Sequence, residues 1–166
     1  MDLRKTKLFD GLSQCDLIVV ESLCIEKQAK EEVFLIQSEL GRNTLYLLIE
    51  GTFIVDGNAG SQLNFTHLCC PGDFVGGGAL FDRLPVANVK AAKGSRYYEI
   101  DTSKIDRTSS LWLALVSNVA NDAFSKLGNT NSILVDNLKH RVFVAKIITT
   151  VFVVICFSIF FISVSD

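Results

Sequence analysis

Histidine is scarce in this 166-residue sequence, which contains His67 and His140 and no others. A metal-dependent enzyme built on β-strands needs several histidine ligands, and zinc sites usually take four ligands in spaced pairs. Cys69 and Cys70 follow closely after His67. Adjacent residues of a strand point to opposite faces, however, and cannot easily chelate one ion. We therefore expect no metal and no cofactor.

The sequence also lacks the motifs that mark common catalytic sites. It contains no nucleophile elbow, no phosphate-binding P-loop and no paired-carboxylate pattern. Asp73 belongs to a Pro-Gly-Asp segment and is better interpreted as a turn residue than as a general base. These absences favour a protein that is not an enzyme and has no catalytic residues.

An excess of positive charge is missing too. The chain has 16 lysines and arginines against 18 acidic residues, which gives a net charge of -2. Because nucleic-acid binding draws on phosphate neutralisation, this balance disfavours a nucleic-acid partner. The N-terminus starts with Met1, Asp2 and charged residues rather than an apolar run, so we expect no signal peptide. Of the 5 cysteines, Cys156 lies in the apolar run described next and the others would lie in the reducing cytoplasm, so we expect no disulfide framework.

A long apolar run is present near the C-terminus. Residues 147–164 contain no charged residue, glycine or proline. As a helix this run would be roughly 27 Å long, close to the hydrocarbon thickness of a bilayer. Two strands would need a turn that the run does not supply, and a core helix apolar on every side would need a larger protein around it. The sequence therefore predicts a transmembrane helix over residues 142–164.

The flanks of this run predict its orientation. Lys139, Arg141 and Lys146 precede it, whereas Ser165 and Asp166 follow it. Since positive flanks stay on the cytoplasmic side, we expect a single-pass membrane protein with its N-terminal body in the cytoplasm and its C-terminus across the membrane. In a bacterium that membrane would be the inner, or plasma, membrane.

Residues 1–107 are rich in short strand-like runs. Turn formers such as Gly51, Asp56-Gly57-Asn58 and Lys93-Gly94-Ser95 separate them. Short strands at this spacing are typical of an all-β roll or barrel rather than of alternating strands and helices. The predicted strands are 32–37, 45–50, 52–55, 61–68, 87–92 and 96–100.

Two helices are predicted beside these strands. Residues 13–24 have apolar residues at helical spacing, with Ser13 as the N-cap. A long amphipathic helix is predicted over residues 108–141, with a kink or break at Gly128 and Asn129. Its apolar stripe packs either on its own domain or against a second copy of the chain. The stripe consists of Val116, Ala120, Ala123, Leu127 and Leu134.

Four stretches of the sequence carry a resemblance to a known family. They are residues 8–13 (Leu-Phe-Asp-Gly-Leu-Ser) with Asp16 and Leu17, 41–51, which ends in Tyr-Leu-Leu-Ile-Glu-Gly, 71–76 (Pro-Gly-Asp-Phe-Val-Gly), and 76–91. In this order they resemble the cyclic nucleotide-binding domain superfamily, in particular the regulatory domain of cyclic AMP receptor protein and its relatives, and residues 76–91 are similar to its phosphate-binding cassette. The resemblance implies a mainly β fold with flanking helices, a β-roll of the double-stranded β-helix or jelly-roll type, in which the long helix takes the place of the dimerisation helix.

The cassette, residues 76–91, departs from the family's pattern where that pattern binds ligand. The resemblance implies a glutamate for the ribose hydroxyl where this chain has Gly77, and an arginine for the cyclic phosphate after Pro85, where it has Val86. Valine makes none of the charge-assisted bonds of a guanidinium, so cyclic nucleotide binding is disfavoured. The remaining ligand-binding candidates are the backbone of the glycine-rich turn and one nearby cation. They are Gly76, Gly77, Gly78, Ala79, Leu80 and Arg83.

Two functions stay open on this basis. One is a non-enzymatic accessory subunit, anchored in the membrane, that docks on an integral membrane protein or forms a homodimer through the long helix. The other is a membrane-tethered sensor that binds a small anionic ligand and signals through that helix. In either case a membrane span replaces the DNA-binding domain that follows the long helix in transcription regulators of the family.

Overall fold

The computed structural model describes residues 2–37, 43–58, 64–85 and 87–128. The chain divides into two compact units, Met1–Asp122 and Ala123–Asp166. The described residues of the second unit, 123–128, are helical. The fold and the candidate site both lie in the first unit.

The chain starts with two short 3-10 helices, η1 (Leu3–Lys5) and η2 (Lys7–Phe9), followed by α1 (Gln14–Leu23). Ser13 is the N-cap of α1, as predicted: the Asp16 N–H donates to its hydroxyl over 3.1 Å. The prediction ran the helix one residue too far. Cys24 instead opens a strand and pairs with Ile100.

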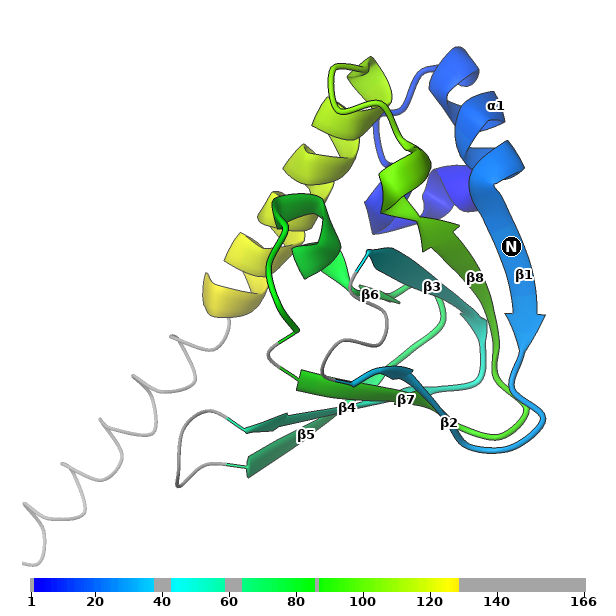
Figure 1. Ribbon diagram of the computed structural model, residues 1–166, viewed down its shortest axis with the longest axis vertical. Coiled ribbons are helices and arrows are strands. Elements are labelled where there is room, and N and C mark those ends of the chain that lie inside the picture. The colour runs from blue at the N-terminus through cyan, green and yellow to red at the C-terminus, as the bar shows by residue number, and fades with distance from the viewer. Residues whose placement is uncertain (1, 38–42, 59–63, 86, 129–166) are drawn as a thin grey trace, which may run out of the picture. The chain divides into compact units, whose positions relative to one another are not determined.

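The described strands form two four-stranded antiparallel sheets. The first sheet has the order β1-β8-β3-β6 and the second the order β2-β7-β4-β5 (Figure 1). The mainly β class and the β-roll are thus confirmed. The strands are β1 (Cys24–Gln28), β2 (Val33–Ile36), β3 (Thr44–Glu50), β4 (Phe53–Asn58), β5 (Asn64–Cys69), β6 (Phe74–Val75), β7 (Ala87–Ala91) and β8 (Arg96–Asp101).

Strand β3 is buried on both faces and separates two apolar clusters. Successive side chains of a strand alternate between faces. Leu45 and Leu47 accordingly join the first cluster, while Tyr46 and Leu48 join the second. We call the first the helix-side cluster; its buried members are Leu8, Phe9, Leu17, Val20, Leu45, Leu47, Phe74, Leu80, Ile100, Ile105, Leu111, Leu115 and Val119. We call the second the roll interior; its buried members are Ala29, Leu35, Ile36, Tyr46, Leu48, Phe53, Cys69, Val89, Ala91 and Tyr97.

Residues 110–128 are helical and are preceded by the short 3-10 helix η4 (Thr102–Lys104). Ser109 caps the start, since its hydroxyl accepts from the Trp112 N–H at 3.1 Å. Leu111, Leu115 and Val119 recur every fourth residue and are buried in the helix-side cluster. This row holds the helix on its own domain.

The stripe predicted from the sequence lies beside that row. Val116 is partly buried against the helix-side cluster, and Ala120 is half-buried. Ala123 and Leu127 are exposed, and Leu134 lies outside the described residues. Homodimer formation through this helix stays a prediction.

Among the described residues, no helix has the length and apolar character needed to cross a membrane. The run predicted to do so, residues 147–164, falls outside that part of the chain, as do Lys139, Arg141 and Lys146. The membrane span and its orientation therefore stay predictions.

Candidate functional site

The turn that enters the cassette is fastened to β3 by main-chain bonds. The Leu48 N–H donates to the Asp73 carbonyl and the Gly72 N–H donates to the Leu48 carbonyl, both at 2.9 Å. The Asp73 carboxylate also accepts from the Cys70 N–H at 2.8 Å. Asp73 thus acts as a turn residue, and the turn places β6 and the following glycines beside the start of β3.

Gly76 is the point where the chain leaves β6 and turns into the cassette. Its φ is 87°, in the left-handed region that favours glycine. A Cβ at this position would overlap the carbonyl oxygen of Thr44. Both the backbone conformation and the space therefore require a glycine here.

Gly77 opens a 3-10 helix, η3 (Gly77–Phe81), and lies directly against the helix over residues 110–122. A Cβ on Gly77 would come within 2.7 Å of Val119 Cγ1. Because Val119 is β-branched, its side chain is restricted in the rotamers it can adopt on a helix. The space that a glutamate side chain would enter at this position is thus occupied by the domain's own helix.

The middle of η3 is buried. Ala79 and Leu80 are buried, and Leu80 is a member of the helix-side cluster. The Ala79 N–H donates to the Gly76 carbonyl at 2.9 Å, so this amide of the glycine-rich turn is used within the cassette. Gly78 is exposed.

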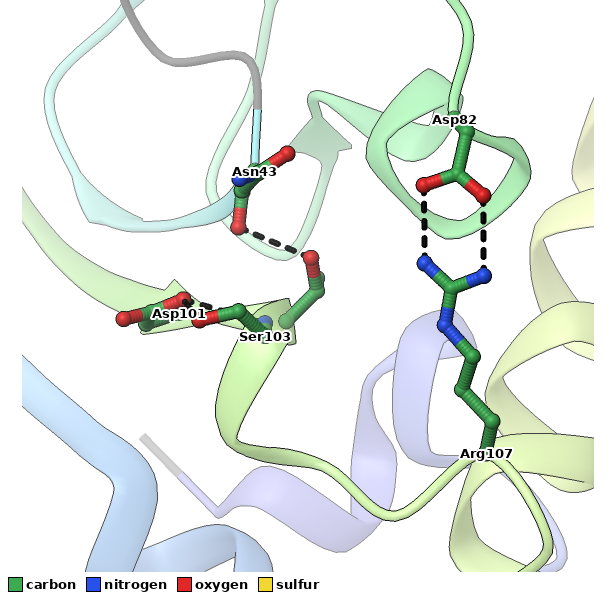
Figure 2. A network of polar contacts seen from close by, with 6 residues as sticks. Asn43, Asp82, Asp101, Ser103 and Arg107 are labelled. Carbon is green, nitrogen blue, oxygen red and sulfur yellow. Dashed lines mark hydrogen bonds and ion pairs between the residues drawn. The ribbon is translucent and has the colours of Figure 1, made fainter.

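Asp82 ends η3 and forms the most direct polar link between the cassette and the region before the long helix. Its carboxylate accepts two hydrogen bonds from the Arg107 guanidinium, at 2.7 and 2.8 Å (Figure 2). The guanidinium also lies over the Trp112 ring, 5.1 Å from the ring centre. The adjacent carboxylate raises the pKa of Arg107 above its ordinary value.

A second polar cluster joins the ends of β3 and β8 (Figure 2). The Thr102 hydroxyl and N–H both donate to the Asn43 carbonyl, at 2.8 and 2.9 Å. The Ser103 hydroxyl and N–H donate to the Asp101 carboxylate. These bonds hold the pKa of Asp101 below its ordinary value. The cluster closes a chain turn and offers no reactive group.

The roll interior is filled by aromatic side chains. Tyr97 packs edge-on against Tyr46 and Phe53, with ring centres 6.0 and 5.8 Å apart. Burial, reinforced by Glu99, raises the pKa of Tyr46 to about 12. None of the buried members of this cluster carries a charge at neutral pH, so within the described residues it supplies no cation for a phosphate.

The described cysteines and His67 do not gather into a metal site. Cys69 is buried in the roll interior and Cys70 is exposed. Burial, with a smaller contribution from Glu21, raises the pKa of the Cys24 thiol to about 12, which makes it a poor nucleophile at neutral pH. In the described part of the chain no three histidine, cysteine or acidic side chains gather in a way that could hold a metal ion.

No protein-family model matches the sequence, and no curated protein matches it. A putative cyclic nucleotide-binding protein from Geobacter metallireducens matches in structure with a TM-score of 0.64 and 20% identity, over 75% of this chain and 95% of that chain. The sensor domain of the transcriptional regulator DNR from Pseudomonas aeruginosa matches with a TM-score of 0.56 and 15% identity, over 77% and 89%. The chain has the fold of a cyclic nucleotide-binding domain.

A third similar structure is the regulatory subunit of a cAMP-independent protein kinase A from Trypanosoma brucei. Its TM-score is 0.59 at 18% identity, over 73% of this chain and 44% of that chain. This chain therefore spans less than half of the kinase subunit's length. At these identities the likeness is one of fold.

Within this cyclic nucleotide-binding fold, the predicted site residues meet in one turn. Gly76 precedes η3, and Gly77, Gly78, Ala79 and Leu80 lie in it. Arg83 follows as an exposed residue whose N–H donates to the Gly78 carbonyl at 3.1 Å. Val86 lies outside the described residues.

Sequence reasoning missed two residues that contact the cassette, Val119 and Arg107. It also missed Asp82 of the cassette as the partner of Arg107. Arg107 is 25 residues from Asp82, and no motif spacing connects the two. The one local signal was the four-residue periodicity of Leu111, Leu115 and Val119, which marks the face that meets the domain.

Proposed function

We propose that the chain is a non-enzymatic, membrane-anchored interaction subunit whose cyclic nucleotide-binding fold works without a cyclic nucleotide. The contact between Gly77 and Val119 carries this proposal. The family resemblance implies a ligand-binding glutamate at Gly77, and a side chain there would meet Val119 Cγ1 already at the Cβ. The cassette is closed onto the helix by protein groups where a ligand would otherwise bind.

The residue after Pro85 supports the same conclusion. The resemblance implies an arginine for the cyclic phosphate, and this chain has Val86. The roll interior offers only apolar and tyrosine side chains among its buried described members. A buried phosphate without a cation or bidentate donor would lose its hydration without replacement.

One structural neighbour with this fold is a regulatory subunit that is described as independent of cAMP. The kinase regulatory subunit from Trypanosoma brucei is described as belonging to a cAMP-independent enzyme. A variant of it with three substitutions, one of which introduces an arginine, is bound to cAMP. By analogy, we take the pattern in this chain to be a regulatory domain that has given up the nucleotide and kept the fold.

The interaction role rests on exposed apolar side chains and on the predicted anchor. Leu113 in the first unit and Phe124 in the second are 70% and 72% exposed. Singly exposed apolar side chains are common on protein surfaces, so the predicted anchor is the stronger of these two supports. With residues 147–164 in the membrane and Lys139, Arg141 and Lys146 on the cytoplasmic side, the partner would be an integral membrane protein or a second copy of the chain.

Ligand binding is tested with the full chain in detergent micelles. We expect no change in melting temperature with cAMP or cGMP at up to about 1 mM. A ligand at 100 times its Kd stabilises a native protein by about 2.7 kcal/mol, which is a shift of about 5–10 °C at this size. The triple variant Gly77→Glu, Val86→Arg, Val119→Ala restores both side chains and the space for one of them, and serves as the gain-of-binding control.

A saturable rise in the wild-type melting temperature with a cyclic nucleotide overturns the proposal. A rise with another anionic metabolite, and not with cyclic nucleotides, favours the sensor function instead. Gentle detergent extraction from the native host tests the interaction role, and recovery of free monomer alone counts against it.

A further inference from the structure

The ion pair between Asp82 and Arg107 connects two elements that the chain brings together from 25 residues apart. Asp82 ends η3 in the cassette, and Arg107 stands three residues before the helical residues 110–122. Two separate hydrogen bonds, one from each terminal guanidinium nitrogen to each carboxylate oxygen, fix their relative orientation (Figure 2).

Arg107 is held in place from its own side. Its guanidinium lies over Trp112, whose ring is partly buried against the helix-side cluster. The preceding residue, Asp106, accepts from both the N–H and the hydroxyl of Thr108, and these bonds lower the pKa of Asp106. The Arg107 guanidinium thus contacts Trp112 of the helix and Asp82 of the cassette at the same time.

The backbone of Asp82 provides an independent observation. Its φ is 51°, and it is the one non-glycine residue of the described chain with positive φ. Glycine takes such positions at Gly11, Gly51, Gly72 and Gly94, where it avoids the strain that a Cβ brings. Aspartate is one of the few non-glycine residues that adopt this conformation readily, so the turn accepts Asp82 while its carboxylate bonds to Arg107.

The cassette and the helix over residues 110–122 also contact each other through apolar groups. Leu80 is buried with Leu115 and Val119 in the helix-side cluster, and Gly77 lies against Val119. The cassette is therefore attached to the helix at two points, an apolar one inside and a charged one at the surface.

We propose that Asp82 and Arg107 form a latch that keeps the cassette closed on the long helix in the ligand-free protein. The latch deepens the proposed function, because it assigns to two side chains the closure that a bound nucleotide would otherwise have to stabilise. It is electrostatic and exposed, with side chains 60% and 61% exposed, so it is sensitive to salt.

Hydrogen exchange of the Ala79 and Arg83 amides in the full chain measures cassette opening, since both amides are bonded inside the cassette. Asp82→Asn keeps a residue that tolerates positive φ and removes the charge, and Arg107→Gln removes the other partner. Each should speed exchange about threefold to fivefold, and the double variant should add little to either single one. Wild-type exchange should approach that of the variants at 1 M salt, where the Debye length is about 3 Å.

Asp82→Gly separates a latch from a turn residue. It relieves the backbone strain, so a residue that served the turn alone would exchange at the wild-type rate or more slowly after this change. A latch predicts faster exchange in spite of the better backbone. The matched control is Arg96→Gln, which breaks another exposed pair, Arg96 with Glu26 at 2.6 Å, and should leave the cassette unaffected.

Wild-type exchange rates in Asp82→Gly and Asp82→Asn overturn the latch. Equally fast exchange of the Ala79 and Arg83 amides in Arg96→Gln also overturns the latch, because the loss of an ion pair outside the cassette would then have the same effect. Since exchange is measured without nucleotide, these results stand apart from the binding test, in which a cyclic nucleotide that binds would overturn the proposed function and leave the latch standing.

Discussion

The roll interior and the helix-side cluster share β3 but are assembled in different ways. In the roll interior, every buried member except Ala29 lies on a strand, and Phe53, Ala91 and Cys69 sit opposite one another across three strands. In the helix-side cluster, one sheet face is covered by segments from both ends of the first unit and by the cassette. The cassette is bound there by single contacts such as Gly77 with Val119.

This difference separates stability from function. Main-chain ladders make the roll interior a rigid support, whereas the closure of the cassette depends on a few side chains that one substitution can change. Substitutions at the cassette can therefore change its contact with the helix while the strand pairing of the roll is kept. Substitutions in the roll interior should therefore lower the free energy of unfolding more than substitutions where the cassette meets the helix.

The largest effect is expected in the roll interior. Phe53 is fully buried and packs edge-on against Tyr97. Phe53→Ala should lower the free energy of unfolding by about 3–5 kcal/mol, because it leaves a cavity among residues held by paired strands. Urea unfolding of the full chain in micelles measures it, with Phe53→Leu as the milder control. A loss below about 1 kcal/mol would mean that this region adapts as readily as the cassette, which would remove the contrast.

The strands were predictable because their pattern is local. The runs at 32–37, 45–50, 87–92 and 96–100 match β2, β3, β7 and β8 within one or two residues at each end. Alternation and turn glycines determine such segments. Strand β1 was missed because its sequence, Cys-Ile-Glu-Lys-Gln, continues the helix without a breaker, and pairing with β8 decides its conformation.

The sequence predicted that the long helix exists, but it did not predict which of its faces packs on the domain. The seven-residue spacing drew attention to Val116, Ala120 and Ala123, whereas burial follows Leu111, Leu115 and Val119. Both rows are apolar, and only the surface of the sheet that the helix covers distinguishes them. In the same way the glycines of the cassette were found from the sequence, but Val119 and the Asp82–Arg107 pair required the tertiary structure.

An intermediate effect is expected where the cassette meets the helix. Gly77→Ala should destabilise the protein by about 1–3 kcal/mol, since the new methyl group overlaps Val119 Cγ1. Gly77 does not have positive φ, so the backbone itself accepts alanine. In the Val119→Ala background the same change should become neutral or stabilise by about 0.4–1 kcal/mol through the unfolded chain. A double-mutant cycle by urea unfolding measures the reversal.

A loss that persists unchanged in the Val119→Ala background would contradict this view of the site. It would show that Gly77 is required for its own conformation and not for the approach of the helix. Val119 would then not be the reason why position 77 lacks a glutamate, while the contrast with the roll interior would remain.

The smallest effect is expected where the helix holds the N-terminal segment. The Asn118 amide donates to the Leu8 and Asp10 carbonyls, at 3.0 and 2.8 Å. Asn118→Ala should lower the free energy of unfolding by about 1 kcal/mol, because both carbonyls lose a donor and one of them is partly buried. Asn118→Asp keeps the shape, turns an acceptor toward the two carbonyls and should be at least as harmful.

Hydrogen exchange decides whether this loss stays local. The Phe9 amide, bonded to the Thr6 carbonyl at 3.1 Å, should exchange faster in Asn118→Ala, while amides of β4 and β7 keep their wild-type rates. Faster exchange in those strands as well would mean that the N-terminal segment and the roll open together. The two regions would then form one cooperative unit, and closure of the cassette could not change independently of the roll.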